Sequence, residues 1–128
     1  MIVVDTSVWV RALRSAGSRE AATLRARVDD DQAALAVPVR VEILAGASNA
    51  DRPRLRRVLS ALPLLYPADE TWRLIDGWLD AAGAAGDRFG LGDLLIAALT
   101  REAGHLLWSL DSDFSRMARL GFVDLYEA

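Results

Sequence analysis

The sequence contains no cysteine, no lysine and a single histidine, His105. Without cysteine the protein has no disulfide bond and no thiolate zinc site, and one histidine provides no histidine pair for zinc. We therefore assign His105 a structural role. Any metal ion that this protein binds must be held by oxygen ligands.

The sequence also lacks an apolar run long enough to span a membrane, and no charged leader precedes its first apolar residues. We therefore expect a cytoplasmic protein with no membrane contact. Its 128 residues, of which 52% are hydrophobic, suffice for one domain with a buried core. The predicted domain covers residues 1–128.

The first seven residues combine a short apolar run with an acid and two hydroxyl residues. Residues 2–4 predict a buried strand that ends at Asp5, and apolar positions then repeat with helical spacing over residues 8–16. Ligands of open parallel α/β sheets bind at the carboxyl ends of the strands, so Asp5 is a candidate site residue. It could equally serve only as the cap of the first helix.

Helical and strand patterns alternate along the rest of the chain, which predicts an α/β protein. A glycine-rich loop is predicted over residues 82–92, where the glycines do not match a dinucleotide-binding fingerprint. The pattern predicts helices over residues 18–31, 38–46, 51–62, 93–103 and 113–119, with another that begins near Asp69, and strands over 33–37, 64–66, 105–108 and 122–125.

The helix that begins near Asp69 carries large apolar residues at helical spacing. Trp72, Ile75, Leu79 and Ala82 form one stripe, which is typical of a helix face packed on the core. Trp78 lies beside this stripe. The two tryptophans could alternatively mark the contact face of a homodimer.

Acidic residues recur where a predicted strand ends or a predicted helix begins. Each one alone could be a helix cap or an exposed helical residue. Parallel strands end at the same edge of a sheet, so we expect these acids to converge, and a cluster of carboxylates needs a cation to offset its repulsion. Mg²⁺ and Mn²⁺ take oxygen ligands of this kind. The acids are Asp5, Glu42, Asp93 and Asp111, with Asp113 close by.

The net charge of −3 does not by itself favour a nucleic-acid partner. If Asp5, Glu42, Asp93 and Asp111 belong to a metal site, however, the rest of the protein carries a charge of +1. All fifteen basic residues are arginines, which suit bidentate contacts with phosphate. The charge is therefore compatible with a metal-dependent reaction on a phosphate backbone.

Four segments, in this order and spacing, resemble PIN-domain ribonucleases and, more narrowly, the VapC-type toxins of bacterial toxin–antitoxin pairs. The resemblance covers nearly the whole chain. One departure is Ser109, where the family more often has threonine, and another is the short spacing between Asp111 and Asp113. The segments are Ile-Val-Val-Asp-Thr-Ser at residues 2–7, Pro-Val-Arg-Val-Glu-Ile-Leu-Ala-Gly at 38–46, Asp-Leu-Leu-Ile-Ala-Ala at 93–98 and Ser-Leu-Asp-Ser-Asp-Phe at 109–114.

The resemblance implies a three-layer α/β/α sandwich around a parallel sheet. It also implies Mg²⁺- or Mn²⁺-dependent cleavage of single-stranded or loop RNA, inhibition by a cognate VapB-type antitoxin, and a homodimer. Asp5, Glu42, Asp93 and Asp111 would be the catalytic metal ligands or their supports, and Asp113 an additional metal ligand. Thr6 or Ser7 would orient Asp5. The expected reaction is hydrolysis by a metal-activated water that leaves a 5′ phosphate.

The sequence is also compatible with two other classes of protein. A metal-dependent phosphatase could also place Asp5 after its first strand, although Ser7 stands where a second aspartate is usual and no lysine is present to hold a phosphoryl group. A binding module without catalytic activity could use the acidic pocket to capture an arginine of a partner. The complete set of acids favours the enzyme.

Overall fold

The computed structural model describes all 128 residues as four strands and seven helices. The strands are β1 (Ile2–Val4), β2 (Ala33–Ala36), β3 (Leu64–Leu65) and β4 (Leu106–Trp108). The helices are α1 (Thr6–Arg14), α2 (Arg19–Asp29), α3 (Val37–Gly46), α4 (Arg52–Leu59), α5 (Asp69–Ala84), α6 (Leu91–Ala103) and α7 (Ser112–Arg119).

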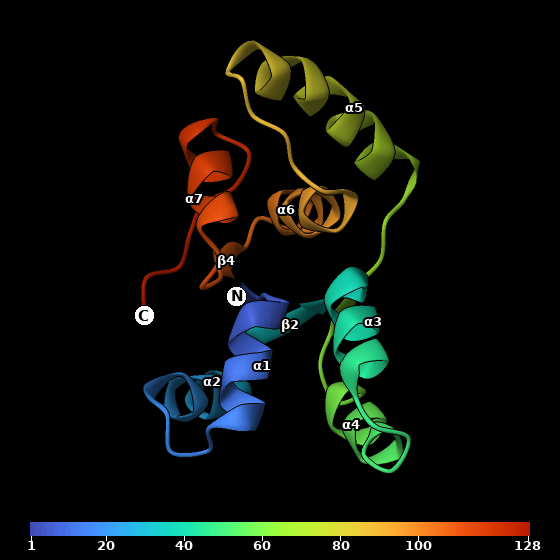
Figure 1. Cartoon of the computed structure of the whole chain (residues 1–128), viewed down its shortest axis with the longest axis vertical. Coiled ribbons are helices and arrows are strands. Elements are labelled where there is room, and N and C mark those ends of the chain that lie inside the picture. Colours follow the sequence, from blue (N-terminus) through green and yellow to red (C-terminus); the bar gives the residue numbers. More distant parts are fainter.

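The four strands form one parallel sheet in the order β3-β2-β1-β4. Figure 1 shows α1 and α2 on one side of the strands and α5, α6 and α7 on the other, which confirms the predicted α/β/α sandwich. The chain proceeds from β1 outward to β2 and β3, and then crosses to the far side of β1 to form β4. This reversal makes the carboxyl ends of β1 and β4 the place where a sheet of this kind binds ligands.

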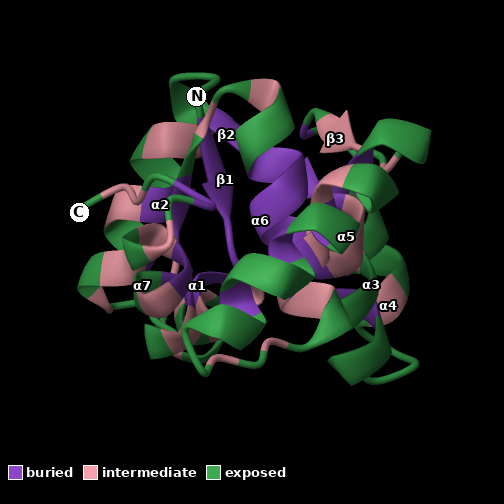
Figure 2. Ribbon diagram, turned by 90° about the horizontal axis from the view of Figure 1, so that it is seen from above, coloured by how far each residue is buried: buried purple, intermediate pink, exposed green.

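The core is centred on β1, β2 and α6, as Figure 2 shows. Every residue of β1 and β2 is buried, because helices cover both faces of the sheet. This explains why both strands are continuous apolar runs rather than alternating patterns. In α6, Ile96, Ala97, Ala98 and Thr100 are fully enclosed between the sheet and α5.

Polar caps fix the helix ends that lie nearest the sheet edge. Asp5 caps α1 through a hydrogen bond from the backbone N–H of Ser7, and Asp111 caps α7 by accepting from the backbone N–H of Asp113. The predicted start of the second helix is confirmed, since Ser18 caps α2. Gly104 ends α6 with a φ of 69°, a conformation that favours glycine.

The predicted loop over residues 82–92 is too long at both ends, and helix α6 already begins at Leu91 rather than at the predicted residue 93. Helix α5 continues to Ala84, and Ala82 is buried against the core. The predicted stripe on this helix is also partly wrong, because Trp72 and Leu79 are both half-exposed. The residues before them, Thr71 and Trp78, are buried instead, and Trp78 stacks on Phe122 with ring centroids 4.4 Å apart. Two of the buried positions therefore lie one residue before the predicted ones.

The predicted last strand over residues 122–125 is wrong. Phe122 and Val123 are buried, but only Leu125 pairs with the sheet, in an isolated parallel bridge to Leu107. Apolar side chains here fill the core without a regular ladder. No helix is long and apolar enough to cross a bilayer.

Candidate functional site

Asp5 lies at the carboxyl end of β1 with only 4% of its surface exposed. Its backbone N–H donates to the carbonyl of Trp108 at 2.9 Å, which extends the pairing of β1 with β4 by one residue. All hydrogen bonds to its side chain reach one oxygen, Oδ2. The other oxygen, Oδ1, accepts none from the protein and remains available to a ligand.

Two serine hydroxyls hold the carboxylate of Asp5. Ser7 Oγ donates to Asp5 Oδ2 at 2.7 Å, and Ser109 Oγ donates to the same oxygen at 2.8 Å. Each hydroxyl also accepts a backbone N–H, Ser7 from Leu110 and Ser109 from Asp111. The serines thus attach the segment after β4 to the end of β1, and Ser109 links the carboxylate of Asp5 to the backbone of Asp111.

Thr6 does not share this role. Its Oγ1 is buried and has no hydrogen-bond partner, so of the two hydroxyl residues after Asp5 only Ser7 orients the carboxylate.

Three carboxylates from two helices converge beside Asp5. Asp93 lies in the first turn of α6, Asp111 caps α7, and Asp113 lies in the first turn of α7. Each offers one oxygen, and these oxygens lie within 4.8 Å of one another. Oxygens so close to one another match the ligand spacing around a single divalent cation.

The environment of Asp93 raises its pKa from 3.8 to about 6. Partial burial is the largest cause, and the charges of Asp111, Asp5, Asp113 and Glu42 follow in that order. A carboxyl group surrounded by like charges resists ionisation unless a cation compensates them. The four other acids therefore all lie close enough to Asp93 to raise its pKa.

Glu42 approaches this volume from α3. It is exposed, and its Oε1 lies so near α6 that a Cβ atom on Gly92 would be 3.4 Å away. The carboxylate of Glu42 therefore lies next to the backbone at Gly92, the residue before Asp93. Glu42 also lines a pocket of about 340 Å³ together with Arg14 and Arg54.

One functional candidate has no clear signal in the sequence, namely Arg116 of α7. Its Nη2 donates to Asp113 Oδ1 at 2.6 Å, and its Nη1 donates to Asp87 Oδ1 at 2.7 Å. These hydrogen bonds, first that to Asp113 and then that to Asp87, raise the pKa of Arg116. Arg116 follows Asp113 by three residues on a helix, a spacing at which two side chains can form an ion pair. The hydrogen bond to Asp87 joins distant segments and can be seen only in the folded structure.

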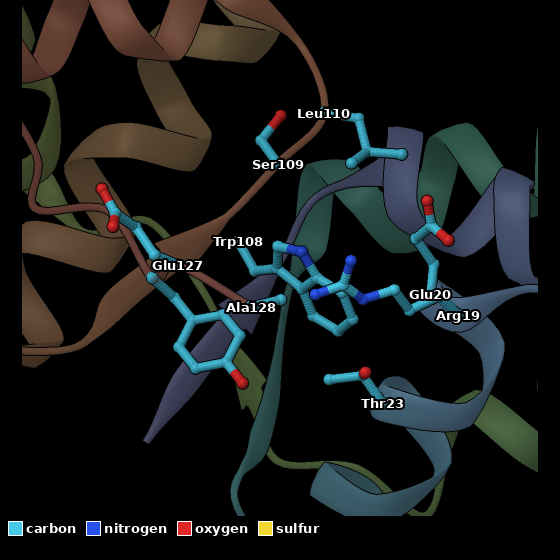
Figure 3. A pocket seen from close by; sticks show the side chains of 9 residues that line it. Arg19, Glu20, Thr23, Trp108, Ser109, Leu110, Glu127 and Ala128 are labelled. Atoms are coloured by element: carbon cyan, nitrogen blue, oxygen red, sulfur yellow. The ribbon is translucent and has the colours of Figure 1, made fainter.

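Figure 3 shows a second pocket, of about 320 Å³, whose wall includes Ser109. Trp108 and Leu110 lie beside Ser109, and Arg19 of α2 faces them. None of the five acids lines this pocket, and Glu20 and Glu127 outnumber its one guanidinium. This pocket therefore includes no part of the acidic cluster, which remains the candidate site.

The structure places every acid predicted for the site at the expected edge of the sheet. It gathers Asp93, Asp111 and Asp113 into one ligand-sized group, while Asp5 and Glu42 flank Asp93 closely enough to raise its pKa. The donors are all carboxylate oxygens, the ligand type that hard divalent cations such as Mg²⁺ and Mn²⁺ prefer. The residues present therefore fit a Mg²⁺ or Mn²⁺ ion.

Comparisons with known proteins agree with this geometry. Residues 2–120 match the PIN domain family. Ribonuclease VapC11 of Mycobacterium tuberculosis is 35% identical over 125 residues, which cover 94% of this chain and 93% of the relative. VapC ribonuclease Mb1587 of Mycobacterium bovis matches this chain with the same identity and the same coverage of both chains.

Solved structures show the same fold. A VapBC2 complex of Rickettsia felis, bound to a DNA fragment from its promoter, matches with a TM-score of 0.81 and 18% identity, over 98% of this chain and 98% of the other. FitAcB of Neisseria gonorrhoeae matches with a TM-score of 0.80 and 18% identity, over 99% and 97% of the two chains. The chain belongs to the PIN-domain family and, within it, to the VapC group.

Proposed function

We propose that this protein is a metal-dependent endoribonuclease and the toxin of a toxin–antitoxin pair. The convergence of Asp93, Asp111 and Asp113 within 4.8 Å, beside the buried Asp5, is the observation that carries the proposal. The names of the VapC relatives, which describe ribonucleases, support the reaction. RNA phosphodiester bonds would be hydrolysed, with a 5′ phosphate on one product.

The proposed cofactor is Mg²⁺ or Mn²⁺, held by Asp5, Asp93, Asp111 and Asp113, with Glu42 as a ligand or a support. A bound ion of this kind supplies an activated water and neutralises charge on the phosphate. The side chains of the protein orient the proposed ligands. Ser7 and Ser109 hold Asp5 Oδ2, so that Oδ1 is free for the cation. Burial and the charges of the neighbouring acids raise the pKa of Asp93 to about 6, and a cation held at this site would favour its ionised form.

The proposed substrate is single-stranded or loop RNA, whose path is suggested by the pocket next to Glu42. Arg14 and Arg54 line this pocket, and both are exposed. Arg14 forms no ion pair, and Arg54 is only loosely paired, at 4.0 Å from Asp51. Exposed guanidinium groups beside the acids would bind the phosphates that flank the scissile bond. They explain how an acidic protein could attract a polyanion at its site.

The proposed partner is a VapB-type antitoxin, since the similar solved structures are toxin–antitoxin complexes. An arginine of that antitoxin, inserted among the carboxylates, would occupy the place of the cation. We also propose a homodimer. Of the two tryptophans considered for its contact, Trp72 is 46% exposed, whereas Trp78 is buried in the core and is no longer a candidate.

The test is cleavage of a mixed RNA pool by the purified protein with Mg²⁺, Mn²⁺ or EDTA. Asp93→Asn is the test variant, and Asp76→Asn is the matched control because Asp76 is an exposed acid on α5. We expect metal-dependent cleavage that is retained in D76N and lost in D93N. Equal cleavage by D93N, or no cleavage by folded wild-type protein free of antitoxin, would contradict the proposal.

A further inference from the structure

We propose that Arg116 is a positioning residue that holds the metal-binding carboxylates in register by clamping α7 to the segment before α6. The inference rests on the proposed metal-dependent function. It adds a residue that no sequence motif marks, and it assigns Arg116 a geometric task rather than contact with RNA.

The planar guanidinium of Arg116 donates to two aspartates at once. Its hydrogen bonds to Asp113 and Asp87, at 2.6 and 2.7 Å, come from different nitrogens and are both charge-assisted. The fork of an arginine fixes the direction of both partners, which the single ammonium of a lysine does not. Arg116 and Asp113 lie on the same helix, and Arg116 links Asp113 to Asp87, which lies outside α7.

The second partner, Asp87, belongs to the connection between α5 and α6. The backbone N–H of Asp87 donates to the carbonyl of Ala82 at 2.8 Å, so this connection is anchored to the end of α5. Phe89 lies under the guanidinium of Arg116, with its ring centroid 4.9 Å from Cζ. Asp93 follows Phe89 closely in the sequence. Arg116 therefore bridges the start of α7 and the segment that delivers Asp93.

Phe89 extends the clamp into the core. It makes an edge-on contact with Phe122 at 6.4 Å, and Phe122 stacks on Trp78 of α5. The guanidinium of Arg116 thus stacks on Phe89, a ring that is itself packed against Phe122. Loss of Arg116 would release the connection at Asp87 and Phe89 together, while the core below would remain packed.

The clamp leaves Asp113 with one oxygen for a cation. Arg116 bonds Oδ1, and Oδ2 accepts no hydrogen bond from the protein. Asp111 is linked to Asp113, because its Oδ1 accepts the backbone N–H of Asp113. Movement of Asp113 would therefore also disturb Asp111. Both acids of α7 depend on the same short turn, and Arg116 is the side chain that secures it.

A positioning role and a purely electrostatic role predict opposite effects on metal affinity. Removal of a positive charge beside five carboxylates should strengthen cation binding if charge alone matters. If position matters, removal of the guanidinium should weaken it, since supports of metal ligands typically contribute about 10- to 100-fold to metal affinity or activity. The sign of the change decides between them.

The experiment measures Mn²⁺ binding to the metal-free full chain by titration calorimetry. Arg116→Met removes both hydrogen bonds, Arg116→Lys keeps the charge without the fork, and Arg119→Met is the matched control, an exposed arginine on α7 with no ion pair. Amide hydrogen exchange over residues 85–90 reports whether the connection is released. Unfolding curves without metal show whether each variant is folded.

We expect Mn²⁺ to bind about 10- to 100-fold more weakly to R116M and R116K, with faster exchange over residues 85–90 and no change in R119M. The Mn²⁺ concentration for half-maximal RNA cleavage should rise by the same factor, while kcat at saturating Mn²⁺ stays within a few-fold of the wild type. Unchanged or tighter Mn²⁺ binding by R116M would overturn the inference, as would wild-type affinity in R116K.

The failure of the inference can be distinguished from failure of the proposed function. If wild-type protein binds Mn²⁺ and cleaves RNA but R116M and R116K behave in the same way, only the clamp is wrong. If the wild type neither binds Mn²⁺ nor cleaves RNA, the proposed function fails, and the clamp fails with it. If R116M does not fold, the comparison of R116K with the wild type still decides the outcome.

Discussion

Ser109 Oγ donates a hydrogen bond of 2.8 Å to Asp5 Oδ2, and the two residues lie 104 positions apart in the sequence. This contact joins the first and last strands of the chain where they end. It also leaves the second oxygen of Asp5 free. The relationship is thus both structural, since it seals the junction of β1 with β4, and functional, since it orients the most deeply buried acid of the site.

Replacement of Ser109 by alanine should therefore impair stability and catalysis together. Ser109→Ala removes one donor from a buried carboxylate and leaves the backbone N–H of Asp111 without its acceptor. We expect a loss of about 1–3 kcal/mol in the free energy of unfolding and weaker Mg²⁺-dependent cleavage. Ser109→Thr keeps the hydroxyl and should remain near wild type. Urea unfolding and cleavage rates check both, and an S109A protein as stable and active as S109T would contradict this role.

Replacement of Asp93 by asparagine should stabilise the metal-free protein above pH 6. The pKa of Asp93 is about 6 in the folded protein, above its ordinary value of 3.8. The native state therefore binds this proton more tightly than the unfolded state, which stabilises the fold. This stabilisation is fully present below the ordinary pKa and is lost as the pH rises through the folded-state pKa. The uncharged amide of the D93N variant does not titrate, so the variant has no such loss.

We expect the free energy of unfolding of D93N to exceed that of the wild type by about 1 kcal/mol at pH 8, after allowance for solvent screening of this partly exposed carboxyl. The difference should shrink toward zero near pH 4. Urea unfolding in EDTA at both pH values measures it, with D76N as the control. A difference that is the same at pH 4 and pH 8 would show that ionisation of the partly buried Asp93 is not its cause.

Arg14 and Arg54 should contribute to RNA binding through phosphate contacts. Arg14→Gln and Arg54→Gln should each weaken binding at low salt and reduce the slope of log affinity against log salt by about 1. The control is Arg57→Gln, an exposed arginine on α4 outside the pocket beside Glu42. Binding of a single-stranded RNA in EDTA, measured at several salt concentrations, avoids cleavage. Wild-type slopes in both variants would remove this pocket from the proposed path of the RNA.

The two tryptophans of α5 should differ sharply in their effect on stability. Trp78 is buried and stacks on Phe122, so Trp78→Ala should cost about 3–5 kcal/mol of unfolding free energy. Trp72 is half-exposed, and Trp72→Ala should change the stability of the monomer by about 0.5 kcal/mol or less. Urea unfolding at low protein concentration makes the comparison. Similar losses in both variants would place Trp72 in an interface or in the core.

The positions of the acids could be predicted because strand ends and helix starts have local signals. A β-branched run before Asp5 marks the end of the first strand, and the apolar helical pattern after Asp93 marks the helix that carries it. Parallel strands then bring such residues to one edge. The contacts that orient the acids could not be predicted, since the bond from Ser109 to Asp5 and the bridge from Arg116 to Asp87 join distant segments. Helical spacing alone also could not choose between Trp78 and Leu79, because both lie near the edge of the apolar face.

The chemistry of the RNA ends tests the central claim most directly. The purified protein is incubated with RNA in Mg²⁺ and in EDTA, and the new ends are identified by sequencing with and without prior 5′ phosphorylation. The account predicts 5′ phosphate ends that are absent in EDTA and in D93N. New 5′ hydroxyl ends that persist in EDTA would show a metal-independent reaction and would contradict the assignment of the acidic cluster as the catalytic centre.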